Sequence, residues 1–167
     1  MAKRSFKVAT FTSAAVADTT GMAARAYMGP QGGSSTQSIL ISEIFMGGQA
    51  GSSAVQLLDV ARDSTVCVTP TALTTAESDA ALNASTAALA APPVSFTTAS
   101  TQPQRSATLG LLMLPFNAFG GLVRWVAYPG EELNLLGNTA SLGEISASFY
   151  TGTTGASVGG HIIYEPF

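Results

Sequence analysis

The chain has few charged side chains. Only 7 basic and 10 acidic residues occur among 167, whereas about a quarter of the residues are charged in an average soluble domain. Because surface charge keeps proteins hydrated and apart, we expect much of this surface to lie against other protein. The formal net charge of −3 supplies no basic field for phosphate groups, so we expect no direct binding of nucleic acid.

Cysteine and histidine are each present once, as Cys67 and His161. A single cysteine excludes an internal disulfide framework and fits folding in a reducing cytoplasm, where Cys67 would be a small buried hydrophobe. One histidine and one cysteine cannot build a His/Cys zinc site within a chain. Three copies of His161 around a trimer axis could do so, but a hydrogen-bonded strand residue is favoured. We predict neither a metal nor a cofactor.

Sequence signatures of catalysis are lacking. There is no serine-hydrolase elbow, Walker loop, dinucleotide fingerprint or calcium loop. Glu131 and Glu132 follow a Pro-Gly turn signal, and neighbouring strand residues point to opposite faces, so they make a poor acid/base pair. Asp59 and Asp63 on either side of Arg62 favour an ion-paired turn over a charged site. We therefore expect that the protein is not an enzyme, and a metal-dependent β-barrel enzyme would need several histidines.

Long apolar runs are also lacking. The most apolar charge-free region, residues 106–123, is interrupted by Pro115, Asn117 and Gly120-Gly121, whereas a membrane helix needs about 20 mostly apolar residues. We interpret it as a buried strand followed by a turn and expect no membrane partner. Polar residues that follow the basic N-terminus interrupt any hydrophobic signal core, so no secretion signal is expected.

Short apolar runs separated by threonine, serine and glycine are plentiful, and this pattern is typical of an all-β protein. We read the chain as one domain, residues 1–167, with residues 1–5 as an N-terminal arm. The expected strands span about 6–12, 23–28, 38–45, 54–61, 65–68, 107–114, 122–128, 131–135, 144–150 and 158–165.

Two of these strands have informative patterns. In residues 144–150, Ile145, Ala147 and Phe149 alternate with polar residues, which indicates one core face. Residues 121–128 are apolar on both faces, so this strand is either covered from two sides or lies at a subunit contact. Either arrangement would hide Trp125.

Residues 70–104 differ from the rest in composition and predict a long Ala/Thr/Pro-rich insertion between strands. Thr74 and Glu77 have the spacing of a capping box before alanine-rich residues 78–91, which favours a short surface helix that Pro92-Pro93 ends. Because residues 80–104 contain no charge, we expect the insertion to be ordered against a neighbour rather than to be a solvated linker.

Residues 124–135 (RWVAYPGEELNL) and 159–165 (GGHIIYE) form a strand, a Pro-Gly turn and a terminal strand. This part resembles the closing strands of small jelly-roll proteins among the structural proteins of tailed bacteriophages, and the low-charge composition is similar too. The resemblance implies an antiparallel β-sandwich of jelly-roll type that acts as a capsid decoration, or cement, protein. It also implies a homotrimer that binds the major capsid protein and stabilises the head shell.

From these observations we expect a virion protein of the capsid surface that is made in the host cytoplasm. The residues that we expect at a subunit or capsid interface are Lys3, Arg4, Phe6, Trp125, Tyr128 and His161. The alternative is a phage tail or surface recognition module that binds carbohydrate, which would require exposed aromatic platforms.

Overall fold

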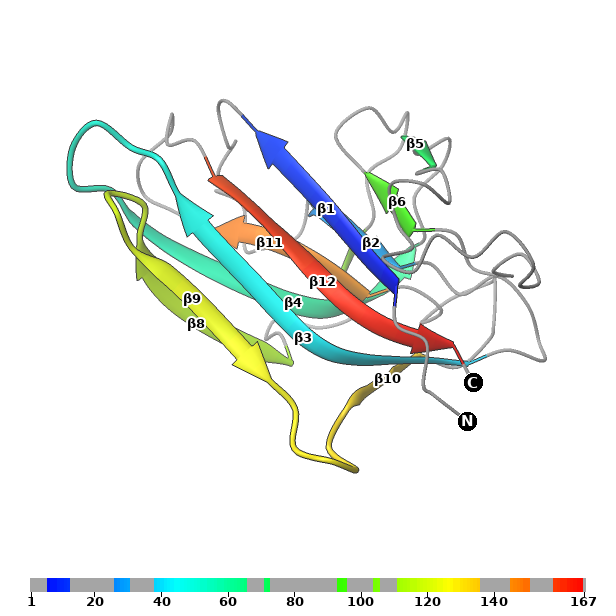
Figure 1. Cartoon of the computed structure of the whole chain (residues 1–167). Coiled ribbons are helices and arrows are strands. Elements are labelled where there is room, and N and C mark those ends of the chain that lie inside the picture. The colour runs from blue at the N-terminus through cyan, green and yellow to red at the C-terminus, as the bar shows by residue number, and fades with distance from the viewer. Residues whose placement is uncertain are drawn as a thin grey trace.

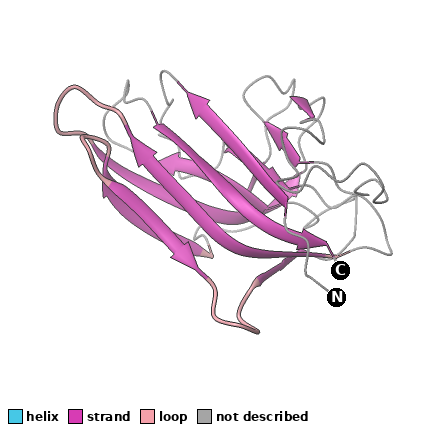
Figure 2. Cartoon of the chain, in the orientation of Figure 1, coloured by secondary structure: helices cyan, strands magenta, loops and turns pink. Residues whose placement is uncertain are grey.

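The computed structural model describes residues 6–12, 26–30, 38–65, 71–72, 93–95, 104–105, 111–135, 145–150 and 158–166. All regular elements in this part are β-strands, and every strand pairing is antiparallel. The strands form two sheets that lie against each other as two layers (Figures 1 and 2). The prediction of an all-β antiparallel fold is confirmed for these residues.

The first layer, sheet A, is built around β3 (Ile39–Gly48). On one side β3 pairs with β12 (Val158–Pro166), which in turn pairs with β1 (Phe6–Thr12). On its other side β3 pairs successively with β10 (Leu133–Leu135) and β9 (Leu122–Val126). These two short strands form one edge of sheet A, and β1 forms the other edge.

The second layer, sheet B, is built around β4 (Val55–Thr65). One side of β4 pairs with β11 (Ile145–Tyr150), and the sheet continues through β2 (Ala26–Pro30) and β6 (Pro93–Ser95) to β5 (Thr71–Ala72). The other side of β4 pairs with β8 (Leu112–Asn117) and with β7 (Gln104–Arg105).

The core lies between the two sheets and is almost entirely aliphatic. The described residues that form its main cluster are Ile39, Ile41, Ile44, Met46, Leu58, Val60, Phe116, Ala118, Leu135, Ile162 and Tyr164. Both sheets contribute to it, so burial of apolar surface holds the layers together. The strand expected at residues 144–150 is confirmed as β11, whose register sets Ala147 opposite Val60 and Phe149 opposite Leu58. Which face of β11 lies toward the core stays a prediction.

A β-bulge in β3 changes which residues face the core. Ile39 and Ile41 are buried before it, and Ile44 and Met46 are buried after it, so the alternation skips one residue. The register of β12 against β3 shifts at the same place. The hydroxyl of Ser42 donates to the carbonyl of Ile163 (3.3 Å) and thereby holds the irregular backbone. Such a bulge redirects the side chains that follow it.

The β8–β9 turn joins the two sheets at one end of the molecule. Asn117 fixes it: its Oδ1 accepts hydrogen bonds from the backbone N–H groups of Ala54 (3.1 Å) and Phe119 (2.9 Å), and its Nδ2 donates to Ser53 Oγ (2.9 Å). The backbone N–H of Ala50 also donates to the carbonyl of Ala118 (2.9 Å). The β3–β4 connection is thus bonded to the β8–β9 turn.

Several predicted boundaries need correction. Residues 54–61 and 65–68 were expected as separate strands, but β4 runs without a break from Val55 to Thr65. Because β4 includes residues 59–63, the ion-paired turn expected there is wrong. Strand alternation places Arg62 on the face opposite to Asp59 and Asp63. Likewise β8 continues through Pro115 instead of ending before it. It is not buried as expected, because Leu111 just before it and Met113 within it are exposed, and among the described strands it pairs with β4 alone.

Other predictions fall on parts of the chain that the structure does not describe. The N-terminal arm and the alanine-rich helix of residues 78–91 lie outside the described residues, as does Cys67. Of the predicted insertion, the structure describes β5, β6 and the first residue of β7.

The close approach of the two connections gives a first test of this end of the fold. A Cβ at Gly48 would collide with the backbone of Ala118, whereas a Cβ at Gly51 would meet nothing within 4 Å. We expect Gly48→Ala to lower the free energy of unfolding by about 1–3 kcal/mol and Gly51→Ala to change it by less than about 0.5 kcal/mol. Urea unfolding measures both, and equal effects of the two substitutions would contradict the packing described.

Gln56 gives a second test, because this side chain is only 1% exposed. Neither atom of its amide group has a hydrogen-bond partner among the described residues. Burial of an unbonded amide is unfavourable, so Gln56→Met, which keeps the length of the side chain, should raise the free energy of unfolding by about 1–2 kcal/mol. A lower stability of this variant in the same urea experiment would mean that the amide is bonded in solution.

Candidate functional site

Exposed large hydrophobic side chains occur along the edge of the sandwich that β8 and β9 form. Among the described residues they are Val55, Leu111, Met113, Phe119, Leu122, Val126 and Tyr128. Six of the seven lie on or beside β8 and β9, and the seventh, Val55, pairs with Asn117 of β8. We call this region the β8–β9 surface. Met113 faces outward from sheet B, whereas Leu122 and Val126 face outward from sheet A, so these side chains lie along both rims of this edge. Exposed apolar surface of this extent is typical of a protein-interaction site.

β9 contributes to the core and to this surface by simple alternation. Val123 and Trp125 pack against the core cluster, whereas Leu122 and Val126 are 62% and 51% exposed. Residues 121–128 were expected either to be covered from two sides or to lie at a subunit contact. Within the described part of the chain the first alternative is wrong, and the second stays a prediction. Trp125 is half-buried rather than fully hidden.

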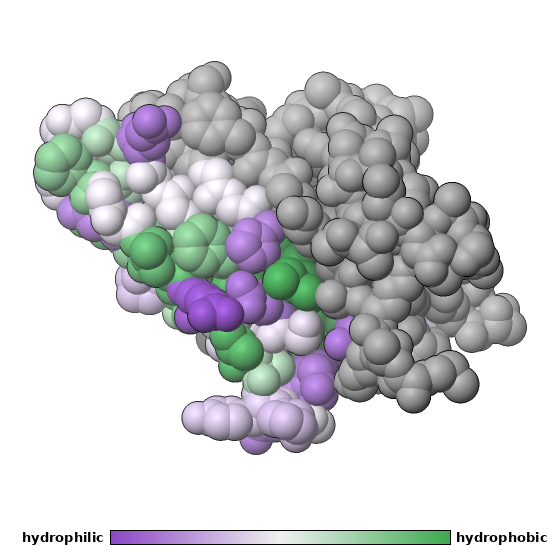
Figure 3. Space-filling view, viewed as in Figure 1, coloured by the Kyte–Doolittle hydropathy of each residue, from purple (hydrophilic) through white to green (hydrophobic). Residues whose placement is uncertain are grey.

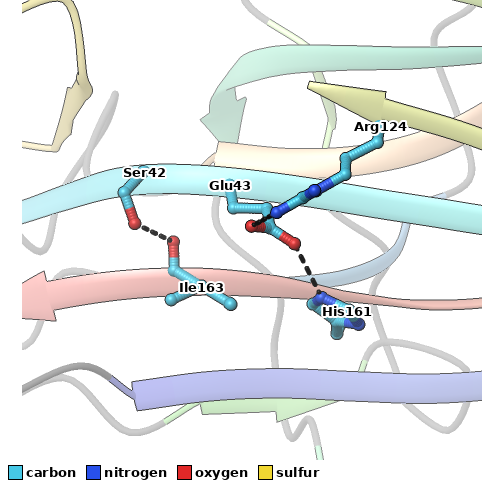
Figure 4. Close-up of polar contacts among 5 residues, drawn as sticks. All are labelled: Ser42, Glu43, Arg124, His161 and Ile163. Carbon is cyan, nitrogen blue, oxygen red and sulfur yellow. Dashed lines mark hydrogen bonds and ion pairs between the residues drawn. The ribbon is translucent and has the colours of Figure 1, made fainter. Parts of the chain in front are cut away.

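A charged cluster occupies the outer face of sheet A beside β9. Glu43 of β3 lies between Arg124 of β9 and His161 of β12 (Figure 4). Its Oε2 accepts a hydrogen bond from an Nη of Arg124 at 2.8 Å, and its Oε1 lies 3.2 Å from Nε2 of His161. The cluster joins three neighbouring strands across the sheet.

The electrostatics of the cluster follow from this geometry. The hydrogen bond from Arg124 is the main cause that lowers the pKa of Glu43, with the contact to His161 acting in the same direction and partial burial opposing both. The same hydrogen bond raises the pKa of Arg124. The ring of His161 also stacks on Phe45, with ring centroids 5.1 Å apart. Glu43 is therefore held as a carboxylate by its neighbours and accepts their hydrogen bonds, which is a structural role.

The loop between β9 and β10 projects away from both sheets (Figure 1). Its Tyr128 is 77% exposed. The backbone N–H of Glu131 donates to the carbonyl of Tyr128 (2.9 Å), Gly130 adopts a φ of 90°, and its N–H donates to a carboxylate oxygen of Glu132 (2.8 Å). The predicted turn is confirmed, and Glu132 serves to close it. Tyr128 was expected within a strand, but β9 ends at Val126.

The predicted interface residues lie in different places. Lys3 and Arg4 are outside the described residues, and Phe6 begins β1 opposite Tyr164. His161 lies on the outer face of sheet A and Trp125 on the inner face, so the fold does not bring them together. Tyr128 lies in the projecting loop.

Sequence reasoning did not single out Glu43, Phe119 or Leu122. Glu43 lies between Ile41 and Ile44, which are three positions apart, and this spacing was the available sign of a bulge that turns its carboxylate outward. Phe119 and Leu122 flank Gly120-Gly121, where a tight turn leaves large side chains exposed.

Nothing within the described ranges has the arrangement of a metal site: no three His, Cys, Asp or Glu side chains group together there. That part of the chain also has no helix long and apolar enough to cross a membrane. Comparisons with protein-family models, curated proteins and solved structures found no match to this chain.

The cluster predicts a pH dependence with a defined sign. Because the folded-state pKa of Glu43 lies below its ordinary value of 4.5, its ionised form stabilises the fold above about pH 4.5, and this contribution is lost as the pH falls through the lowered pKa. Glu43→Gln should therefore lower the melting temperature at pH 7, and its difference from the unaltered protein should shrink as the pH falls below 4.5 and through the lowered pKa.

Glu131→Gln, in the exposed loop, is the matched control and should leave the melting temperature nearly unchanged at each pH. If Glu43→Gln lowers the melting temperature by the same amount at pH 3 and at pH 7, the result would contradict the role of the ionised carboxylate.

Proposed function

We propose that the protein is a virion structural protein, a capsid decoration protein of tailed bacteriophages that stabilises the head shell through protein-protein contacts. In this proposal the two-sheet fold is a jelly-roll sandwich, the protein assembles as a homotrimer, and its partner is the major capsid protein. Support comes from the resemblance of residues 124–135 and 159–165, from the low charge, and from the exposed apolar side chains.

The observation that carries the proposal is the β8–β9 surface. Seven large hydrophobic side chains are exposed along the edge formed by β8 and β9. A contact that covers this edge would be stabilised by about 25 cal/mol per Å² of apolar area that is buried, before entropic costs. A trimer presents three such surfaces at once, and several weak contacts then act together through effective concentration.

One observation favours the alternative of a carbohydrate-binding module of a phage tail or surface structure. Tyr128 projects on a loop with 77% of its surface exposed, and exposed aromatic rings provide the flat apolar surface on which sugars can stack. Phe119, which is also exposed, lies beyond the other end of β9. A glycan array with the purified protein tests this alternative.

The proposal predicts that the β8–β9 surface binds the shell. Phe119→Ser and Tyr128→Ser remove exposed aromatic side chains, so the double variant should keep its melting temperature but bind phage heads at least roughly tenfold more weakly. Gln49→Ala changes an exposed polar residue of the β3–β4 connection and serves as the control that should bind normally.

Co-sedimentation with heads of the phage that encodes the chain measures this binding, and light scattering gives the mass of the free protein. Three times the chain mass of 16.9 kDa is expected. Failure of the unaltered protein to bind heads would overturn the capsid proposal, and glycan binding in its place would establish the alternative.

A further inference from the structure

Among the described strands β9 pairs only with β3, so one side of its backbone has no partner strand there. At the two ends of its pairing with β3, the N–H of Gly48 donates to the carbonyl of Gly121 (3.2 Å), and the N–H of Ala127 donates to the carbonyl of Ser42 (2.9 Å). Because hydrogen bonding alternates along an antiparallel pair, Val123 and Trp125 also bond toward β3. The backbone groups of Leu122, Arg124 and Val126 then point away from it.

No strand in the described part of the chain pairs with this outer side of β9. Figure 1 likewise shows β9 at the margin of its sheet, with β3 on one side only. The three outward residues therefore offer three N–H donors and three carbonyl acceptors in the spacing of a β-ladder. An open edge of this kind is a template for an additional strand.

The neighbouring edge strand, β8, is protected from such pairing. The N–H of Ala118 donates to the carbonyl of Ala54 (2.8 Å), and the same alternation then places Pro115 among the outward residues of β8. Proline lacks an N–H and is tolerated on edge strands for this reason. β8 thus has a missing donor in the middle of its open edge, whereas β9 has a complete set.

The side chains of β9 are compatible with pairing to an identical strand. Leu122 and Val126 lie two residues before and two residues after Arg124, and all three are exposed on the outer face of sheet A. Figure 3 shows hydrophobic surface on either side of a strongly hydrophilic patch in this region. Antiparallel pairing about a two-fold axis at Arg124 would set Leu122 of each copy opposite Val126 of the other copy.

Charge complementarity supports a second copy as the occupant. Two arginines opposite each other would repel, but each Arg124 brings Glu43 with it, bound at 2.8 Å. The paired edges would therefore carry two carboxylates and two guanidinium groups with no excess charge. Arg124 is still 57% exposed and has further N–H donors that could reach the second carboxylate.

We infer that the open edge of β9 pairs antiparallel with β9 of a second copy of this chain, which joins two sheets A into one continuous sheet across a two-fold axis. This contact uses the same surface on both partners and closes on itself. It is separate from a three-fold contact, so it gives a dimer when it acts alone and a hexamer when it acts together with a trimer interface.

Hydrogen exchange of individual backbone amides, with NMR detection, tests the pairing directly. In dilute protein, the amides of Leu122, Arg124 and Val126 should exchange quickly, and those of Val123 and Trp125 slowly, because only the latter pair bonds to β3. In concentrated protein, the three outward amides should slow by at least about tenfold, as expected for amides that enter a β-ladder. Outward amides that exchange quickly at every concentration would overturn the inference.

A proline at the first residue of β9 tests the same contact by mutation. Leu122→Pro removes an outward N–H without removing a hydrogen bond to β3, as Pro115 does in β8. It should weaken association by roughly tenfold or more, since each symmetric contact loses two hydrogen bonds. Leu122→Ala keeps the N–H and should weaken association less. Association of Leu122→Pro equal to that of the unaltered protein would overturn the inference, and if this variant fails to fold, the exchange pattern decides.

The solution mass separates this inference from the proposed trimer. A mass of twice 16.9 kDa supports strand pairing and contradicts the trimer, and a mass of six chains that falls to three in Leu122→Pro supports both. A trimer with quickly exchanging outward amides overturns strand pairing alone. A monomer at all concentrations overturns strand pairing and the trimer, but it leaves binding to the shell to the co-sedimentation experiment.

Discussion

The bulge at Ser42 in β3 is the constraint on which the rest of sheet A depends. β3 pairs with β12, β9 and β10, so its side-chain alternation sets that of the whole layer. Without the extra residue, strict alternation after Ile41 would direct Glu43 into the aliphatic core and Ile44 to the surface. With it, Ile44 and Met46 complete the core, and Glu43 binds Arg124 and His161 on the outside.

The chemistry of short strands made the fold class predictable, and strands β1, β3, β9, β11 and β12 fall close to their expected ranges. Glycine and threonine residues between the short apolar runs indicated where the strands end. Pro115 was misread because proline breaks a central strand but not an edge strand whose N–H groups face outward. The sequence does not reveal which strands are edges, since this depends on pairings between distant segments.

The candidate site was less predictable for the same reason. The turn after Tyr128 follows from Pro129 and Gly130, whose conformational preferences are local. The contact of Glu43 with Arg124 and His161 joins residues 81 and 118 positions apart, and no local rule could join them. Because its neighbours in sequence are apolar, Trp125 was expected to be hidden from solvent. Strand alternation instead exposes Leu122 and Val126 and leaves Trp125 half-buried.

The hydrogen bonds of Asn117 also decide where the chain can be altered by engineering. The β8–β9 turn is bonded to the β3–β4 connection, and a Cβ at Gly121 would collide with the backbone of Asn117 itself. An affinity tag or a fused peptide inserted there would separate the two sheets. In the projecting loop the hydrogen bonds of Tyr128 and Gly130 are made to other residues of the same loop. Gly130 itself has a φ of 90° and should be kept, but nothing lies within 4 Å of its Cβ position. Foreign sequence is therefore best displayed from that loop.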